Sequence, residues 1–267
     1  MKKEKDKAYA HLAALYEYLC DDCDYERWSQ YFVNLLKDGL AHSKGVSKEQ
    51  VCLSRLKGID VGCGSGYFTR FFAKCGCDMT GVDISEEMLC VAEEKTMAEG
   101  LNARYVRGDV VNFKPFERYA FATACNDIFN YVAKDKLQKA FKNVAKSLQE
   151  GGVFVFDVSS RKKLSTKVAN CVSADDRENV TYLSFGKAEG DVVTMDVTLF
   201  VKRSDGAFDR FDELHTQYMY DVPEIVSALE TVGFDTLSVT GLFNEDINEA
   251  DRLCFLAVKR KKGKEAR

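Results

Sequence analysis

The sequence predicts an α/β fold built on a doubly wound, mostly parallel sheet of seven strands, and three observations support this prediction. From about residue 57, short apolar segments alternate with segments of helical periodicity, which is the pattern of strand–helix–strand units. A glycine-rich turn in "IDVGCGSGYF", residues 59–68, joins the first strand to the first of these helices. The next two strands each end in an aspartate, Asp83 and Asp109. Right-handed crossovers between parallel strands cover both faces of such a sheet and place ligands at the carboxyl ends of the strands.

The composition is that of a globular protein with a sizeable core. The chain has 267 residues, of which 46% are hydrophobic and 30% charged, and its net charge is −4. This balance gives no general attraction to nucleic acid, and no stretch is long and apolar enough to span a bilayer. The basic cluster "KRKKGKEAR" at 259–267 is expected to be a solvated tail. We expect a monomer or homodimer with no nucleic-acid or membrane partner.

The cysteines are expected to be reduced. The chain has ten of them, but it is large, and its start, "MKKEKDKAYAHL", lacks the apolar segment of a signal peptide. We therefore expect a cytoplasmic protein. Cys20 and Cys23 form a CxxC pair and Cys75 and Cys77 a CxC pair, but no second CxxC pair or nearby histidine pair completes a zinc site. No metal is expected.

The strands of the core follow in order, each bounded by a turn or a helix signal. Five are predicted at "GIDV", "CDMTGVD", "ARYVRGD", "YAFATACND" and "VFVFDV", and a closing pair at about 234–242 and 252–259. Ser85 is expected to cap the helix after the second strand, and Pro223 to open the helix before the closing pair. Gly151 and Gly152 are expected to end the helix before the fifth strand.

Two further regions flank the core. Residues 8–40 have the spacing of two helices, rich in tyrosine, and predict an N-terminal helical cap. After about residue 175, the period-two alternation of "VVTMDVTLFV", the Asp205–Gly206 turn and "FDRFDELHTQYMY" predict an antiparallel β insertion. The predicted organisation is a cap at 1–50, a core at 51–160 and 221–260, a substrate-side insertion at 161–220 and a basic tail at 261–267.

The glycine turn does not match the known phosphate-binding loops. A nucleoside-triphosphate loop needs a Gly-Lys-Ser/Thr ending, which this turn lacks. In the dinucleotide fingerprint G-x-G-x-x-G, the third glycine is replaced here by Tyr67. A pyrophosphate in this turn would also lie near Asp60, and two like charges at ~4 Å repel by about 4 kcal/mol at an effective dielectric constant near 20. The turn is therefore a poor phosphate site.

A cationic ligand reverses the sign of this interaction. S-adenosylmethionine carries a sulfonium and an ammonium group but no phosphate, so Asp60 is expected to favour its ammonium group, directly or through water, while the glycine backbone closes around the methionine part. Asp83 ends the second strand, about twenty residues further on, and is placed to accept both ribose hydroxyls. Asp109 is expected to accept the adenine amino group, and the amide of Val110 to bond the ring. The apolar wall for the adenosine is expected from Ile84 and Met88.

With these residues in place, the sequence resembles the class I S-adenosylmethionine-dependent methyltransferases, whose sheet is Rossmann-like. The resemblance covers about residues 57–160, in "IDVGCGSGYFTRFFA", "GVDISEEML", "ARYVRGDV", "ACNDIFNYV" and "GGVFVFDVSS". It implies cofactor-binding roles for Asp60, Asp83, Asp109 and the glycine turn, that is Gly62, Cys63, Gly64 and Gly66. More narrowly, the aromatic cap and the insertion look like those of small-molecule methyltransferases, among them sugar-amine N-methyltransferases and related uncharacterised bacterial enzymes. The cap departs from the usual pattern of the family after its first tyrosine pair.

The end of the fourth strand, "CNDIFNYV", is expected to meet the methyl acceptor. Methyltransferases resembling this fold that act on nucleic acid or glutamine place an Asn/Asp-Pro-Pro-Tyr/Phe motif here. Residues 125–128, "CNDI", do not match it, which argues against those substrates. Asn130 and Tyr131 follow, where related small-molecule enzymes place a polar residue near the acceptor.

The candidate catalytic residues are Tyr16, Tyr131 and His215. Tyr16 of the cap is expected to meet Tyr131 from above, and Trp28 to close on the methionine end of the cofactor, with Asn126 as a further cofactor contact. Packing alone is the alternative for each aromatic residue. His215 is a candidate general base or acceptor anchor, although an exposed strand histidine is the preferred interpretation.

The sequence thus predicts a methyltransferase that transfers the methyl group of S-adenosylmethionine to nitrogen or oxygen of a small molecule by in-line displacement. Correct alignment of the reacting atoms is worth up to ~7–11 kcal/mol in such reactions, so strong acid–base chemistry is not required. A non-catalytic S-adenosylmethionine binder that acts as a sensor or scaffold is the first alternative. A nicotinamide oxidoreductase is the second.

Overall fold

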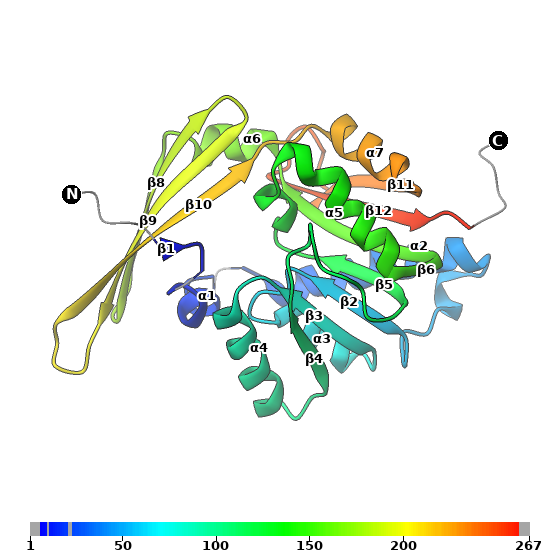
Figure 1. Ribbon diagram of the computed structural model, residues 1–267, viewed down its shortest axis with the longest axis horizontal. Helices are drawn as coiled ribbons and strands as arrows, with labels where there is room; N and C mark the ends of the chain where they lie inside the picture. The colour runs from blue at the N-terminus through cyan, green and yellow to red at the C-terminus, as the bar shows by residue number, and fades with distance from the viewer. Residues whose placement is uncertain (1–5, 10, 21–22, 262–267) are drawn as a thin grey trace.

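The computed structural model describes residues 6–9, 11–20 and 23–261 of the chain. These residues form two sheets, a seven-stranded one in the core and a five-stranded one that projects to one side (Figure 1). The predicted basic tail lies outside the described residues from residue 262 on. Within the described part, no helix is long and apolar enough to cross a membrane.

The core sheet confirms the predicted doubly wound, mostly parallel arrangement, in the strand order β11-β12-β6-β5-β2-β3-β4. Its strands are β2 (Lys57–Val61), β3 (Asp78–Asp83), β4 (Ala103–Arg107), β5 (Tyr119–Ala124), β6 (Leu148–Ser159), β11 (Phe234–Gly241) and β12 (Arg252–Lys259). The strands β2 to β6 pair in parallel, whereas β12 runs antiparallel to both β6 and β11. The central strand β5 is buried along its whole length, and β6 is buried from Gly151 on, because both of their faces are covered.

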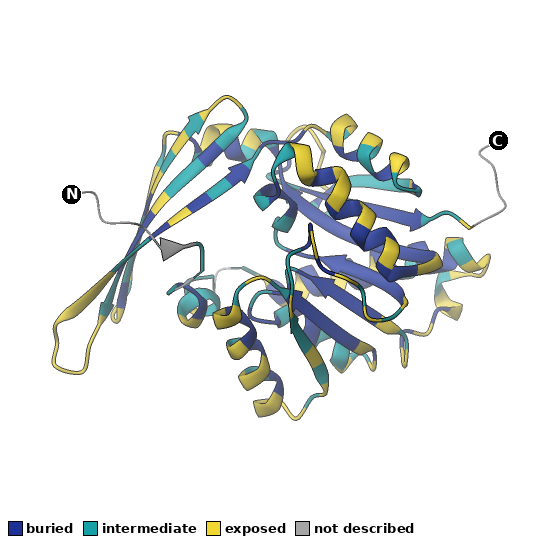
Figure 2. Ribbon diagram, in the orientation of Figure 1, coloured by how far each residue is buried: buried dark blue, intermediate teal, exposed yellow. Residues whose placement is uncertain are grey.

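Helices cover both faces of this sheet, with their apolar sides inward and their charged sides in solvent (Figure 2). The helices are α2 (Tyr25–Lys44), α3 (Tyr67–Lys74), α4 (Glu86–Ala98), α5 (Lys134–Ser147) and α7 (Val222–Thr231). Phe32 of α2 and Phe72 of α3 belong to the core cluster on one face, and Phe141 of α5 and Leu229 of α7 to the cluster on the other. The helix α4 lies against β3 and β4 near the edge of the sheet.

The helix start signals behave as predicted, but one stop signal does not. The hydroxyl of Ser85 accepts a hydrogen bond from the backbone N–H of Met88 at 3.1 Å, so it caps α4. The expectation that Gly151 and Gly152 end a helix is wrong, since α5 ends at Ser147 and both glycines lie inside β6. The last carbonyls of this helix region instead accept hydrogen bonds from Nζ of Lys259, which replaces a glycine cap.

The smaller sheet confirms the antiparallel insertion. Its strands are β7 (Val172–Asp176), β8 (Val180–Glu189), β9 (Val192–Lys202) and β10 (Phe208–Tyr218), and β1 (Asp6–Lys7) pairs in parallel with β10. The turn between β9 and β10 contains Gly206 with φ +85°, as the Asp205–Gly206 signal predicts. The short helical segments are η1 (Ala13–Leu15), η2 (Lys48–Gln50), η3 (Ile128–Tyr131), α6 (Arg161–Lys163), η4 (Leu164–Val168) and η5 (Leu242–Asn244).

The start of the cap differs from the expected helix. Of the residues described before α2, α1 (Tyr16–Leu19) and the single turn η1 alone are helical. The backbone N–H groups of Tyr9, His11 and Leu12 donate instead to the carboxylate of Glu213 on β10, at 2.8, 2.6 and 2.9 Å. A distant acid therefore takes the hydrogen bonds that a helix would otherwise use, which the helical spacing of this segment does not reveal.

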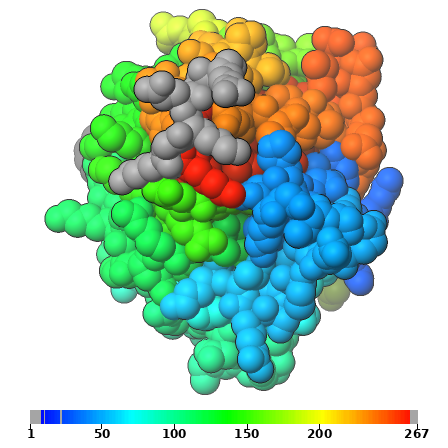
Figure 3. Space-filling view, turned by 90° about the vertical axis from the view of Figure 1, so that its right-hand side faces the viewer, coloured from blue at the N-terminus to red at the C-terminus, as the bar shows by residue number. Residues whose placement is uncertain are grey.

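The last described residues, up to residue 261, are bound to the side of the core remote from the smaller sheet. Figure 3 views this side and shows the end of β12, in red, between green and blue segments of the chain. Lys259 donates to the carbonyl oxygens of Ala145 and Leu148, and Lys261 donates to that of Ser43. The candidate functional site lies on the opposite side, where the cap and the smaller sheet meet the core.

Candidate functional site

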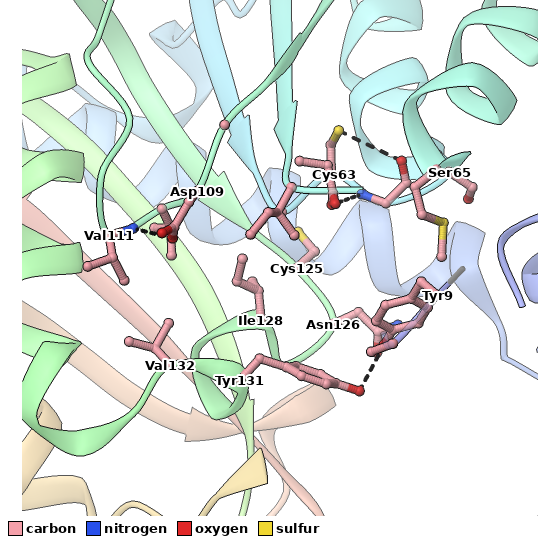
Figure 4. A pocket seen from close by; sticks show the side chains of 18 of the residues that line it. Tyr9, Cys63, Ser65, Asp109, Val111, Cys125, Asn126, Ile128, Tyr131 and Val132 are labelled. Carbon is pink, nitrogen blue, oxygen red and sulfur yellow. Dashed lines mark hydrogen bonds between the residues drawn. The ribbon is translucent and has the colours of Figure 1, made fainter. Parts of the chain in front are cut away.

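A cavity of about 420 Å³ lies at the carboxyl ends of the parallel strands, beneath the cap (Figure 4). Its walls come from the turn after β2, the ends of β3 and β4, the segment after β5 and the N-terminal segment. The sequence-predicted residues among its lining are Tyr16, Gly62, Cys63, Gly64, Asp83, Ile84, Met88, Asp109, Val110, Asn126 and Tyr131. Ligands of doubly wound sheets bind at this end of the strands.

The glycine turn forms one wall and depends on left-handed backbone angles. Gly62 and Gly64 have φ values of +69° and +52°. A Cβ atom on Gly62 would lie 2.1 Å from Cδ1 of Ile128, whereas one on Gly64 would meet only Sδ of Met88, at 4.0 Å. The backbone at Gly64 therefore faces open space in the cavity, so a ligand can approach it closely. Gly66 does not line the cavity, and its own Cβ would collide with the hydroxyl of Tyr105 at 2.6 Å.

Two acids face the cavity, each at the end of its strand. The carboxylate of Asp83 accepts the backbone N–H of Gly64 at 2.8 Å and that of Ser85 at 2.9 Å, which fixes it against the glycine turn. Burial raises the pKa of Asp83, although these two bonds act in the other direction. Asp109 accepts the backbone N–H of Val111 at 2.8 Å, as the dashed line in Figure 4 shows.

Asp60 lies outside the cavity, so of its two predicted ways of reaching the ammonium group, directly or through water, the direct one is excluded. It is 1% exposed and does not line the cavity. Its two carboxylate oxygens accept hydrogen bonds from the hydroxyls of Thr69, at 2.6 Å, and Thr123, at 2.8 Å. The direct contact with a ligand ammonium group is therefore replaced by a link between β2, α3 and β5 beneath the glycine turn.

The burial of Asp60 predicts a pH dependence of stability. Burial raises the pKa of Asp60 from 3.8 to about 6, against the effect of the two threonine hydroxyls. The folded protein then binds this proton more tightly than the unfolded chain, so stability falls as pH rises from about 4 to about 6, by about 2–3 kcal/mol. Asp60→Asn should remove this part of the pH dependence, which urea unfolding of both proteins at a series of pH values will measure. If the difference in unfolding free energy between the two proteins is the same at pH 4 and pH 7, Asp60 is not the group responsible.

The cap is attached directly to the glycine turn. Glu17 of α1 accepts the hydroxyl of Ser65 at 2.5 Å and Nη2 of Arg70 at 3.2 Å, and it is paired with Lys95 of α4. The hydroxyl of Tyr16, the neighbouring residue, is hydrogen-bonded to the side-chain amide of Asn126. The cap therefore covers the cavity through specific polar contacts, but the hydroxyl that bonds to Tyr131 is that of Tyr9, at 2.9 Å, rather than that of Tyr16 as expected.

Trp28 takes no part in the cavity wall. Its side chain is buried under the cap, and the guanidinium of Arg252 lies 4.5 Å from its ring centroid. The predicted contact with the methionine end of the cofactor is thus corrected to packing, because α2 turns this ring toward β12. Tyr25, which stands at the start of the same helix, does line the cavity.

His215 is 3% exposed, so the preferred expectation of an exposed strand histidine is wrong. Its Nδ1 lies 3.2 Å from the hydroxyl of Tyr131, which is in turn hydrogen-bonded to the hydroxyl of Tyr9 at 2.9 Å. The dashed line at the hydroxyl of Tyr131 in Figure 4 marks its hydrogen bond to Tyr9. Nε2 of His215 lies 3.0 Å from the carboxylate of Glu213. A continuous chain of hydrogen bonds therefore leads from the cavity wall into the smaller sheet.

A buried ion pair supports the segment that follows β5, and the sequence reading missed it. Asp157, which is fully buried in β6, pairs with Arg252 and accepts the backbone N–H groups of Asn126 at 2.7 Å and Asp127 at 3.0 Å. Arg252 also donates to the side chain of Asn126 at 3.0 Å. One signal in the sequence pointed to this site: an acid inside the otherwise apolar run "VFVFDV" requires a partner.

Asn130 is also buried, and it joins the same region to the smaller sheet. Its side chain donates to the carbonyl oxygen of Tyr218 at 2.9 Å and accepts the backbone N–H of Ser159 at 2.9 Å. It does not line the cavity. Its position next to Tyr131 thus fixes the local backbone.

The lining fits S-adenosylmethionine and does not fit a diphosphate. Asp83 and Asp109 present two carboxylates, and Lys136 is the one lysine or arginine among the described residues of the lining. A diphosphate beside these acids would be repelled, whereas hydroxyl and amino groups would be bound. The open backbone at Gly64 and the apolar side chains of Ile84 and Met88 complete a cradle for a nucleoside. Among the described residues, no group of three or more histidine, cysteine, aspartate or glutamate side chains is placed to hold a metal ion.

Comparison with known proteins agrees with this geometry. The methyltransferase domain family matches residues 59–152. YqeM of Bacillus subtilis, which carries a provisional methyltransferase name, is 29% identical over 259 residues, covering 95% of this chain and 98% of that protein. The crystal structure of an S-adenosylmethionine-dependent methyltransferase from Clostridium acetobutylicum has a TM-score of 0.80 and 28% identity, covering 96% of this chain and all of that one. CalS10 of Micromonospora echinaspora, an amino pentose methyltransferase solved with S-adenosylmethionine bound, shares the fold, with a TM-score of 0.69, 18% identity and coverage of 96% of this chain and 100% of its own.

Proposed function

We propose that this S-adenosylmethionine-dependent methyltransferase methylates a nitrogen or oxygen atom of a small molecule. One observation carries the choice of acceptor. The hydroxyl of Tyr131, on the cavity wall, is hydrogen-bonded onward to a buried histidine, and this is a path for a proton. An acceptor that gives up a proton on methylation, such as an amine or a hydroxyl, can release it along such a path.

The residues proposed to hold the cofactor are those that line the inner part of the cavity. We assign the ribose hydroxyls to Asp83 and the adenine edge to Asp109 and Val110, with Ile84 and Met88 as the apolar wall. Gly62, Cys63 and Gly64 are proposed to lie along the methionine part, with Tyr16 and Asn126 above it. When bound, S-adenosylmethionine supplies an electrophilic methyl group on a positively charged sulfur atom.

The chain's own residues are proposed to bind the acceptor and to receive its proton. The acceptor gains a methyl group and loses a proton, so the positive charge that disappears from sulfur is matched by one that forms on the protein. Burial raises the pKa of Tyr131 and of Tyr9, so both hydroxyls are protonated near neutral pH. Tyr131 is therefore proposed to pass its proton to Nδ1 of His215 as it takes one from the acceptor.

Proteins with the same fold support an acceptor of this kind. CalS10 acts on an amino pentose, which is a small molecule with an amine nitrogen. The segment after β5, "CNDI" at residues 125–128, lacks the motif that planar amide and base acceptors require. The cavity is covered by the cap, which also suits a small acceptor better than a polymer.

Two measurements test the proposal. Calorimetry should show micromolar binding of S-adenosylhomocysteine and no binding of NAD. Incubation with methyl-labelled S-adenosylmethionine and metabolite extracts should then yield a labelled small molecule, identified by mass spectrometry.

Tyr131→Phe should keep the binding of S-adenosylhomocysteine and lose most of the methyl transfer. Binding without transfer to any extract would instead support the non-catalytic alternative, and tight NAD binding without S-adenosylhomocysteine binding would overturn the cofactor assignment.

A further inference from the structure

The buried carboxylate of Glu213 on β10 has four hydrogen-bond partners. Its side chain is fully buried, and its Oε1 accepts the backbone N–H groups of His11 and Leu12 at 2.6 and 2.9 Å. Its Oε2 accepts the backbone N–H of Tyr9 at 2.8 Å and lies 3.0 Å from Nε2 of His215. One carboxylate thus holds both the N-terminal segment and the histidine behind the cavity wall.

The charge state of Glu213 fixes the direction of these hydrogen bonds. Burial alone would raise the pKa of Glu213, but the bonds from His215, His11, Leu12 and Tyr9 outweigh it and hold the pKa below its usual range. An ionised carboxylate accepts hydrogen bonds and donates none. Nε2 of a neutral His215 must therefore carry the ring proton.

The rest of the chain of hydrogen bonds follows from that tautomer. With the proton on Nε2, Nδ1 is bare and accepts the hydroxyl proton of Tyr131 across 3.2 Å. The oxygen of Tyr131 then acts as an acceptor, toward the hydroxyl of Tyr9 at 2.9 Å, the side chain of Gln217 and a group in the cavity. The opposite tautomer would point an N–H at Tyr131 and block this path.

We propose that Glu213 is a positioning residue for the methyl transfer, which sets the tautomer of His215 and, with the same carboxylate, docks the N-terminal segment that carries Tyr9 over the cavity. The proposal rests on the proposed function, in which Tyr131 and His215 take the proton of the acceptor. The acceptor takes the methyl group from sulfur, which keeps the electron pair of the broken bond, and the acceptor N–H or O–H bond breaks. The proton enters the hydroxyl of Tyr131, and the hydroxyl's own proton moves to Nδ1. The imidazolium that results is stabilised by the carboxylate of Glu213. The docking of the cap and the tautomer of His215 that can receive the proton are thereby linked, because both depend on the side chain of Glu213.

Nuclear magnetic resonance of the ligand-free protein tests this without any acceptor. The chain has only three histidines, so ¹⁵N-histidine labelling gives few signals, and His215→Gln identifies those of His215. Under conditions where the ring is neutral, wild-type His215 should show a protonated Nε2 and a bare Nδ1. A protonated Nδ1 in the wild-type protein would overturn the proposal, even if Glu213 variants do not fold.

Glu213→Gln should disturb one of the two partners of the carboxylate. Glutamine has one oxygen and one NH₂ group, so either the NH₂ faces His215 and reverses the tautomer, or it faces the backbone of the segment and expels it. Either the Nε2–H form of His215 falls to a minority, or the amides of Tyr9, His11 and Leu12 exchange with solvent at least tenfold faster. Asp212→Asn is the matched control, since Asp212 is the preceding residue of β10 and its carboxylate bonds to Thr198 and Arg210 instead. If Glu213→Gln changes neither the tautomer nor the exchange relative to Asp212→Asn, Glu213 does not position this site, whether or not the protein transfers methyl groups.

Discussion

Replacing Asp83 with alanine should weaken the binding of S-adenosylhomocysteine by about a hundredfold or more. The carboxylate lies at the end of β3 and faces the cavity, and its backbone bonds to Gly64 and Ser85 hold it in place. If it accepts both ribose hydroxyls, each charge-assisted hydrogen bond contributes roughly 1.5–3 kcal/mol, so loss of two costs at least about 3 kcal/mol. Calorimetric titration of the ligand into both proteins measures the difference.

The same strand provides the control for this variant. Asp78 begins β3 at the opposite end of the sheet, where it is exposed, so Asp78→Ala should leave the affinity unchanged. Asp83→Asn keeps the size of the side chain. If its affinity for S-adenosylhomocysteine falls much less than that of Asp83→Ala, part of the loss in the alanine variant comes from movement of the glycine turn. An Asp83→Ala protein with a native circular dichroism spectrum and wild-type affinity would remove Asp83 from the cofactor site.

The sheet and the inner wall of the cavity could be predicted because their signals are local. A strand, a glycine turn and a helix lie within a few residues of one another, and each acid ends its own strand. The order of the strands then brings Gly64, Asp83 and Asp109 to one edge without any further information. The direction of a side chain is less secure, as Asp60 demonstrates. Its place in the motif is correct, but its carboxylate turns to Thr69 and Thr123 inside the core.

The outer wall could not be predicted in the same way, because its contacts join residues that are far apart in the sequence. Tyr9 and Glu213 are separated by 204 positions, and their bond replaces a helix that the local spacing favours. The alternating pattern of β10 shows only that His215 lies on one face of its strand. The side chain is buried because that face of the smaller sheet packs against the cap. Tertiary contacts of this kind override local propensity and leave no period in the sequence.

Replacing Arg252 with methionine should lower the free energy of unfolding by about 3–5 kcal/mol. The carboxylate of Asp157 is fully buried, and the variant leaves it without its cation in a medium of low dielectric constant. Asp157 also accepts the backbone N–H groups of Asn126 and Asp127, which have φ values of +67° and +53°. These angles are costly for residues other than glycine, so the loop depends on this carboxylate staying in place. Urea unfolding of the ligand-free proteins measures the loss.

The structure offers two matched comparisons that isolate the buried charge. Arg260 forms an exposed pair with Asp235 just beyond the same strand, so Arg260→Met should cost less than about 1 kcal/mol. The double variant Arg252→Met with Asp157→Asn removes both charges and should recover part of the stability lost in the single variant, because the one oxygen of asparagine still accepts one of the two backbone N–H groups. A single variant as stable as Arg260→Met would mean that the pair does not hold the loop. A double variant no more stable than the single one would mean that the stabilisation comes from the stacking of Arg252 on Trp28 rather than from its charge.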